Sequence, residues 1–371
     1  MTQRTELTTI TDDYEAVVAE DVGLIDVRAP GEFKNGSVPG AVNIPLLNDD
    51  ERHRVGLTYR QQGRDTALEL ARQLVETGKK DMLTDMWTAY LKRYPDAVMY
   101  CARGGMRSAT AASWTAEKAG APVRRIKDGY KGFRTYLLGR LDPETITAKP
   151  ILVGGRTGSG KTTVINSFAN AIDLEAIANH RGSSFGRFTT PQPGQADFEN
   201  RLATALIKHA HAGFSYLILE DEGRHVGKRF LPRELSGFFS GGELIVLEAP
   251  FEERVDNIFR EYVIESQKQY GAGTVSTDAM WVWFEEMNHN LERIAKRLGS
   301  SLLEQIRALL ESGCYHQQKN GDPEAHKNWI RLLLNHYYDP MYDYQLKKRD
   351  KAPLLAGREL VVMQYLRTLD P

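Results

Sequence analysis

Cysteine is scarce in this sequence, which has only Cys101 and Cys314 among its 371 residues. Two cysteines so far apart give neither a disulfide framework nor the paired spacing of a zinc site. Long apolar runs are also missing, because no segment reaches the ~18 apolar residues that span a membrane. The polar, acidic start "MTQRTELTTITDDYEAVV" lacks the apolar core of a signal peptide. We therefore expect a cytoplasmic protein with free thiols and no membrane contact.

An excess of charge of one sign is missing too. The formal net charge is -1, so no overall field attracts a polyanion, and a nucleic acid would have to bind local basic patches. Hydrophobic residues make up 41% and charged residues 26%, which excludes disordered and fibrous classes. At about 150 residues per domain, the length predicts two or three domains. We find no internal repeat.

One of the two cysteines lies in an unusual loop, "VMYCARGGMRSAT", residues 98–110. An apolar strand precedes Cys101, five residues separate it from Arg107, and an alanine-rich helical segment follows. Further strands are expected at residues 24–27 and 41–44, with helix-forming segments between the strands, which predicts a parallel α/β sheet. In such sheets active groups lie in the loops at the carboxyl ends of strands.

The composition of this loop favours a reactive cysteine. Glycines let successive backbone N–H groups point inward, and the following helix adds its positive end, so the loop would bind an anion and stabilise a thiolate. The alternative is a small buried apolar residue at a strand end, but such a residue needs neither glycines nor arginines. Cys314 has no basic loop and is predicted to be inert. We predict Cys101 as the catalytic thiol and the following anion pocket around it: Arg103, Gly104, Gly105 and Arg107.

The second half begins with a complete phosphate-binding motif, "GGRTGSGKT", after a strand expected at residues 151–153 and before a helix-forming run. Backbone N–H groups would cradle phosphates, the lysine would add a charge, and the threonine hydroxyl could hold Mg²⁺. No resident metal is predicted, and the absence of an asparagine-lysine-x-aspartate segment leaves guanine specificity without support. The predicted diphosphate-binding residues are Gly155, Gly158, Ser159, Gly160, Lys161 and Thr162.

Acidic residues follow an apolar strand in "SYLILEDE", residues 215–222. This is where a carboxylate that orients a metal-bound water is expected, and Glu220 and Asp221 are the candidates. The alternative is that these acids only solvate the end of the strand.

From residue 251 onward, apolar residues at spacings of three and four predict helices. We predict a parallel α/β domain with the cysteine loop at residues 1–140, a P-loop α/β domain at 141–250, and a helical region at 251–371 packed on the latter.

The segment "HYYDPMYDYQLKKRDK", residues 336–351, interleaves tyrosines with basic residues. It could stack bases and bind phosphates, or it could hold packed tyrosines beside solvated charges. Likewise the loop-rich stretch "HRGSSFGRFTTPQPGQADFEN", residues 180–200, is either a functional loop or an ordinary surface connection. Both pairs of alternatives stay open.

The first domain resembles a rhodanese, a family that carries sulfur or selenium on a cysteine, through "LIDVRAPGEF" and "YCARGGMRS". Rhodaneses commonly have histidine where Ser37 stands, and their loop usually has one residue fewer. The longer loop resembles that of cell-cycle tyrosine phosphatases with the same fold. A cysteine phosphatase therefore remains an alternative, with Asp128 or Glu32 as its general acid.

With "GGRTGSGKT", "HRGSSFGR", "LEDE" and "YYDPMY" added, the whole chain resembles the bacterial tRNA 2-selenouridine synthases. The resemblance implies a transferase that replaces sulfur by selenium at position 2 of the wobble 2-thiouridine of tRNA, with selenophosphate as donor. It also implies an S-geranylated intermediate made from geranyl diphosphate. The partners would be tRNA and a supplier of selenophosphate, and no cofactor would be tightly bound. A module switched by nucleotide hydrolysis is the remaining alternative.

Overall fold

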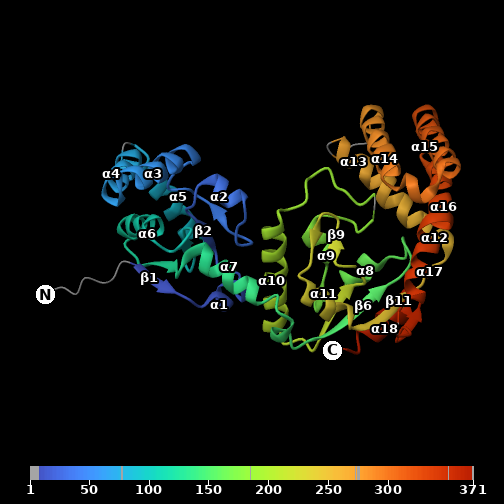
Figure 1. Cartoon of the computed structure of the whole chain (residues 1–371), viewed down its shortest axis with the longest axis horizontal. Coiled ribbons are helices and arrows are strands. Elements are labelled where there is room, and N and C mark those ends of the chain that lie inside the picture. The colour runs from blue at the N-terminus through green and yellow to red at the C-terminus, as the bar shows by residue number, and fades with distance from the viewer. Residues whose placement is uncertain are drawn as a thin grey trace. The chain divides into compact units, whose positions relative to one another are not determined.

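The computed structural model describes residues 8–76, 78–183, 185–271, 273, 276–349 and 351–369. The chain forms two compact units, one made of Met1–Ile146 with Gly194–Ala212 and the other of Thr147–Pro193 with Gly213–Pro371 (Figure 1). The chain first passes from one unit to the other between Ile146 and Thr147, within "LDPETITAKP". This point lies just after the domain boundary that the sequence predicts at residue 140. Within the described residues, no helix is both long and apolar enough to cross a membrane.

The first unit contains a parallel sheet in the strand order β1-β5-β4-β2-β3. The parallel sheet and the strands predicted around residues 24–27, 41–44 and 96–100 are confirmed. Its apolar core lies around Trp87, Met99 and Ile25, which are fully buried. The strands are β1 (Thr8–Thr11), β2 (Leu24–Asp26), β3 (Val42–Asn43), β4 (Val98–Tyr100) and β5 (Val123–Ile126).

The helices of the first unit include one from the second half of the sequence, α10. It packs against α1 and α7. The predicted boundaries put this segment in the P-loop domain and residues 195–200 in a loop-rich stretch, whereas in the structure these residues are helical and belong to the first unit. An apolar stripe along a helix indicates that this face is buried, but it does not indicate which domain core the face packs against. The helices are α1 (Tyr14–Ala19), α2 (Pro30–Lys34), α3 (Asp49–Gln62), α4 (Arg64–Glu76), α5 (Lys80–Arg93), α6 (Met106–Ala119), α7 (Gly129–Gly139), η1 (Pro143–Thr145) and α10 (Gln195–His211).

The second unit contains a parallel sheet in the order β12-β11-β6-β8-β7. Its edge strand β12 comes from the C-terminal region, so the region predicted as helical at residues 251–371 also supplies a strand that completes the P-loop sheet. The strands are β6 (Lys149–Gly154), β7 (Ala171–Ile172), β8 (Tyr216–Glu220), β11 (Glu243–Leu247) and β12 (Leu355–Gly357), with a separate antiparallel pair of β9 (His225–Val226) and β10 (Arg229–Phe230).

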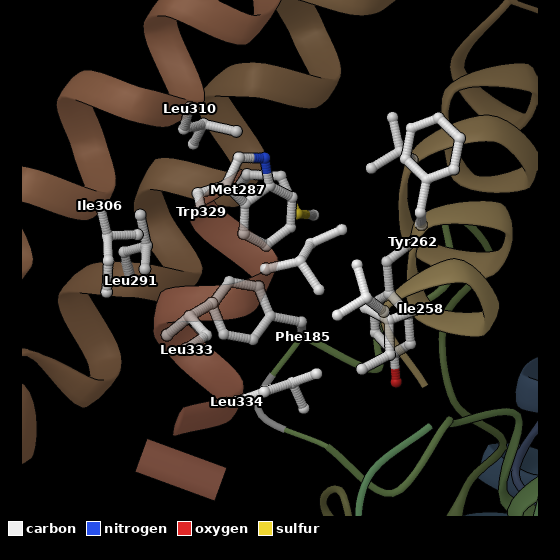
Figure 2. Close-up of a cluster of buried hydrophobic side chains, with 14 of the residues drawn as sticks. Phe185, Ile258, Tyr262, Met287, Leu291, Ile306, Leu310, Trp329, Leu333 and Leu334 are labelled. Atoms are coloured by element: carbon white, nitrogen blue, oxygen red, sulfur yellow. The ribbon is translucent and has the colours of Figure 1, made fainter. Parts of the chain in front are cut away.

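The C-terminal helices enclose a second apolar core, shown in Figure 2. Trp283, Trp329 and Leu333 are buried there, and Phe185 reaches the same cluster from the segment that follows α9. Two stretches, η2 and η4, are π-helical. The helices of this unit are α8 (Lys161–Ile165), α9 (Leu174–Ala178), α11 (Arg233–Ser240), α12 (Phe251–Ile258), η2 (Phe259–Glu265), α13 (Ser266–Tyr270), α14 (Thr277–Leu298), α15 (Ser300–Asn320), η3 (Glu324–His326), α16 (Lys327–Leu333), η4 (Leu334–Tyr338), α17 (Asp339–Lys347) and α18 (Glu359–Leu366).

Candidate active sites

The cysteine loop follows the central strand β4, at the carboxyl edge of the first sheet. Cys101 is only 3% exposed, and its Sγ lies 3.3 Å from Ser108 Oγ in the first turn of α6 and 3.9 Å from the carbonyl oxygen of Gly105. Cys101 also belongs to the buried apolar core of this unit, so its burial fits both interpretations of this cysteine. The polar contacts of its Sγ at the start of a helix are what favours a functional thiol.

Glycines at two positions let the loop lie directly against the start of α7. Gly104 has φ +63°, and a Cβ there would lie 2.8 Å from the backbone nitrogen of Asp128. Gly129 has φ +57°, and a Cβ there would lie 2.2 Å from the carbonyl oxygen of Cys101. The same carbonyl accepts a hydrogen bond from Tyr130 N at 2.8 Å. The loop therefore has a defined shape that side chains at these two glycines would prevent.

The two arginines of the loop have different surroundings. Arg107 is engaged by Glu32, with Nη1 at 2.5 Å from Oε2 and Nη2 at 3.1 Å from Oε1, while Arg103 is exposed. Burial alone would raise the pKa of Glu32, but the hydrogen bonds and charge of Arg107 hold it below the usual value. Glu32 is thus an ionised partner of Arg107 and is not poised as the general acid of a phosphatase.

Ser37, where rhodaneses commonly have histidine, is held through its backbone by α10. Its N–H donates to Asp197 Oδ1 at 2.9 Å, and its carbonyl accepts from Asn200 Nδ2 at 2.7 Å. Arg134 of α7 donates to Asn200 Oδ1 at 2.6 Å, which ties α10 to the helix that supports the cysteine loop. Sequence reasoning missed this support, because its partners are more than 60 residues apart along the chain.

The phosphate loop of the second unit joins β6 to α8. Its three motif glycines all have positive φ, and a Cβ at Gly155 would lie 2.5 Å from the carbonyl oxygen of Leu247. Lys161 Nζ donates to the carbonyl oxygen of Gly155 at 3.1 Å. The hydroxyl of Ser159 is buried and has no hydrogen-bond partner among the residues that the structure describes. A buried unpaired donor inside an anion-binding loop is what a phosphate oxygen would satisfy.

The carboxylates at the end of β8 separate into different environments. Thr162 Oγ1 donates to Glu220 Oε1 at 3.0 Å, and Glu220 Oε2 is buried with no hydrogen-bond partner in the described part of the chain. Asp221 instead pairs with Arg349. Glu220 therefore faces the phosphate loop, whereas Asp221 is already neutralised by an arginine. The sequence left the choice between these two acids open.

Two further glutamates join Glu220. Carboxylate oxygens of Glu175, Glu220 and Glu222 all lie within 4.8 Å of one another, a spacing that could hold a metal ion. Burial raises the pKa of Glu175 to about 10, of Glu220 to about 8 and of Glu222 to about 7, and neighbouring carboxylates add to each shift. No sequence signal could have identified Glu175, which lies 45 residues before Glu220 on a short helix.

The phosphate loop opens into a cavity of about 570 Å³. Its far walls come from η2, α14, η4 and α17, and both π-helical stretches supply tyrosines to it, which fits the frequent occurrence of π-bulges at functional sites. The loop predicted from "HRGSSFGR" forms one wall, where Ser183 Oγ lies 2.9 Å from Tyr262 Oη and Arg181 pairs with Glu261. That segment is thus part of the site. Apart from the phosphate loop and the acidic residues, the side chains that line the cavity include Arg181, Tyr262, Arg297, Tyr337, Tyr338, Tyr342 and Arg349.

A narrow apolar extension adjoins this cavity. Thr157, Ser183, Tyr262 and Tyr338 line both spaces. In Figure 2, Phe185, Ile258 and Leu334 are among the side chains of this extension. Its free volume is about 20 Å³. The extension therefore leads from the phosphate loop into the helical core.

Comparisons with known proteins agree with this architecture. The family model described as the tRNA 2-selenouridine synthase AAA domain matches residues 148–370, and the model of a rhodanese-like domain matches residues 6–136. A tRNA 2-selenouridine synthase of Sulfurovum sp. (strain NBC37-1) is 44% identical over 96% of this chain and 97% of its own. Proteins of the same name from Hydrogenovibrio crunogenus and Marinobacter nauticus are 43% and 41% identical, over 96% of this chain and 98% and 97% of theirs.

Proposed function

This chain belongs to the tRNA 2-selenouridine synthase family, and we propose that it replaces sulfur by selenium at position 2 of a wobble 2-thiouridine in tRNA. The observation that carries the proposal is that one chain contains two anion-binding loops. One is the cysteine loop at the start of α6, and the other is the phosphate loop, which opens into a large cavity. The first would handle a chalcogen delivered as selenophosphate. The second would hold a diphosphate.

In the cysteine loop, Cys101 is the catalytic thiol. The backbone N–H groups around Gly104 and Gly105, with Arg103, would receive the phosphate of selenophosphate. Arg107 supports the loop through Glu32 and adds positive charge close to the thiol. An enzyme that supplies selenophosphate is the expected partner, together with the tRNA.

In the phosphate loop, Lys161 and the hydroxyl of Ser159 would bind the diphosphate of geranyl diphosphate. Thr162 and Glu220 fit an accompanying Mg²⁺, because Glu220 Oε2 is buried and no described residue forms a hydrogen bond with it. Mg²⁺ would offset the charge that builds on a departing diphosphate. Glu175 and Glu222, which close the acidic cluster, would balance that cation.

The reaction at this site would be an alkylation. The uridine sulfur forms a bond to the first carbon of the geranyl group, the carbon–oxygen bond to diphosphate breaks, and the N3 proton passes to solvent. The alkylated sulfur is then a better leaving group. The selenium of selenophosphate forms a bond to C2, the C2–S bond breaks, and geranylthiolate leaves and takes up a proton. Water then cleaves the P–Se bond, which releases inorganic phosphate and returns a proton to N3 of the selenouridine.

The apolar extension beside the phosphate loop supports an isoprenoid donor. Its walls are side chains such as Phe185, Ile258 and Leu334, and it starts at Thr157 of the loop itself. Its free volume is about that of one water. Side chains of the helical core would therefore shift to admit a ten-carbon chain.

Nucleoside mass spectrometry tests the proposal. Transfer RNA with 2-thiouridine is incubated with geranyl diphosphate and selenophosphate and with wild type, Cys101→Ala, Lys161→Ala or, as the matched cysteine control, Cys314→Ala. We expect selenouridine with wild type and Cys314→Ala, a stop at the geranylated nucleoside with Cys101→Ala, and no geranylation with Lys161→Ala. Unchanged tRNA with folded wild-type protein would reject the proposal.

A further inference from the structure

Helix α17 forms one edge of the mouth of the phosphate-loop cavity. Tyr342, Leu346 and Arg349 on or next to it line the cavity. The opposite side of the helix carries Tyr344 and Lys348, which face solvent. One short element therefore has an inner face in the cavity and an outer face on the surface directly beside it.

The outer face combines an aromatic ring with uncompensated positive charge. Tyr344 is 60% exposed, and Lys348 Nζ lies 4.5 Å from the centre of its ring. Lys347 and Lys348 form no ion pair with any residue that the structure describes, whereas Arg349 pairs with Asp221. In a chain with a net charge of -1, two adjacent unpaired lysines are a local basic site.

Positive charge also lies across the mouth, on α14. Arg297 lines the cavity, is exposed, and donates to Tyr337 Oη at 3.4 Å. Among the described residues, no carboxylate pairs with it. The mouth of the cavity thus has cationic side chains on two of its walls.

The inner face holds an unsatisfied polar group. The hydroxyl of Tyr342 is buried and has no hydrogen-bond partner among the described residues. It is close to the phosphate loop, since a Cβ at Gly154 would lie 3.3 Å from it. Buried hydroxyls are nearly always paired, so this one indicates a group that enters the cavity on binding.

We propose that α17 is the RNA-binding edge of this cavity and that it presents the target nucleotide of the anticodon loop to the phosphate loop. Lys347 and Lys348 contact the RNA backbone, and a base next to the target stacks on Tyr344. The target uridine enters the cavity, where the hydroxyl of Tyr342 donates a hydrogen bond to a carbonyl oxygen of the base. The proposal rests on the tRNA-modifying function proposed above.

Single-stranded RNA is the occupant that these features fit. Binding sites for single strands combine cationic side chains along the backbone with exposed aromatic rings on which bases stack. Enzymes that modify a base take it out of the stack into a pocket, and the cavity of about 570 Å³ can hold a nucleobase beside a diphosphate.

Fluorescence anisotropy with a labelled anticodon stem-loop RNA containing 2-thiouridine tests the outer face. We expect Tyr344→Ala to weaken binding by about 5- to 100-fold, the range for loss of one stacked base, and Tyr344→Phe to retain affinity. In Lys347→Gln/Lys348→Gln, the slope of log affinity against log salt should fall by about 0.7 for each lost phosphate contact.

Helix α15 provides a matched control. Tyr315 is 57% exposed, and Lys319 follows it by four residues, the spacing of Tyr344 and Lys348, but unlike α17 the helix α15 supplies no residue to the lining of the cavity. Tyr315→Ala and Lys319→Gln should leave RNA affinity and its salt dependence unchanged. Losses of equal size in these control variants would overturn the proposal.

The inner face is tested with Tyr342→Phe, which keeps the ring and removes the hydroxyl. We expect slower geranylation at saturating geranyl diphosphate, with an unchanged affinity for inorganic pyrophosphate measured by calorimetry. A wild-type geranylation rate in Tyr342→Phe would overturn the proposal, and so would wild-type RNA affinity in the Tyr344 and lysine variants. Neither result would contradict the proposed modification reaction. A wild-type protein that binds pyrophosphate but leaves 2-thiouridine tRNA unmodified would reject the proposed function and this proposal with it.

Discussion

The hydroxyl of Thr162 donates to Glu220 Oε1 at 3.0 Å, so the last residue of the phosphate motif and the end of β8 meet at one point. The neighbouring Asp221 is paired with Arg349. We predict that Glu220→Gln weakens Mg²⁺-dependent binding of pyrophosphate by at least about tenfold, because one carboxylate of the cation site is lost. Calorimetry at several Mg²⁺ concentrations measures this effect. Asp221→Asn should change the Mg²⁺ dependence far less, and equal effects of both variants would contradict the assignment.

The ion pair between Glu32 and Arg107 predicts a change in thiol reactivity. Glu32→Gln removes the carboxylate that offsets Arg107 near Cys101, so a thiolate at Cys101 gains electrostatic stabilisation. We expect faster alkylation of Cys101 by iodoacetamide at neutral pH and a loss of about 1–3 kcal/mol in unfolding free energy. Labelling is followed by mass spectrometry in a Cys314→Ala background. An unchanged alkylation rate would show that Arg107 does not act on the thiol.

The close contact at Gly129 predicts a strong effect of a single methyl group. Gly129→Ala would place Cβ 2.2 Å from the carbonyl oxygen of Cys101 in a backbone conformation with φ +57°. We expect a lower melting temperature, with a loss of about 2 kcal/mol or more, and altered alkylation of Cys101. Gly139→Ala at the end of the same helix meets nothing within 4 Å and should be neutral or slightly stabilising. Similar melting temperatures for the two variants would contradict the packing described here.

Buried His326 predicts a loss of stability in acid. Burial lowers the pKa of His326 to about 4, while its ring accepts a hydrogen bond from Trp329 Nε1 at 3.1 Å. The unfolded chain takes up the proton at a pKa near 6.5, so the folded state binds fewer protons between pH 6.5 and 4, and stability falls as the pH falls through this window. The loss is on the order of 3 kcal/mol at most.

Denaturant unfolding between pH 7 and 4 checks this prediction, with His326→Gln as the variant. The variant should show a flatter pH dependence than wild type. Some slope should remain, because burial also lowers the pKa of His180 to about 4. A variant curve parallel to that of wild type would exclude His326 as the source.

The sequence was sufficient for features that depend on local pattern. The spacing from Gly155 to Thr162 and the glycine loop after Cys101 are contiguous segments, and each requires backbone conformations that only such residues allow. Strand β4 and strand β6 were predictable for the same reason, because apolar runs between turn residues determine them. The parallel sheets and the order of the two domain types followed from these elements.

Only the tertiary structure decided which distant residues meet. Glu175 joins Glu220 because it follows β7, which is the parallel neighbour of β8 and ends at the same edge of the sheet. Helix α10 joins the first unit because its apolar face packs there. The tyrosines of the segment at residues 336–351 lie in different environments, since Tyr338 is packed and Tyr344 is exposed. Such outcomes depend on contacts between residues tens to hundreds of positions apart, and a pattern read along one chain shows that a face is apolar or charged without showing what covers it.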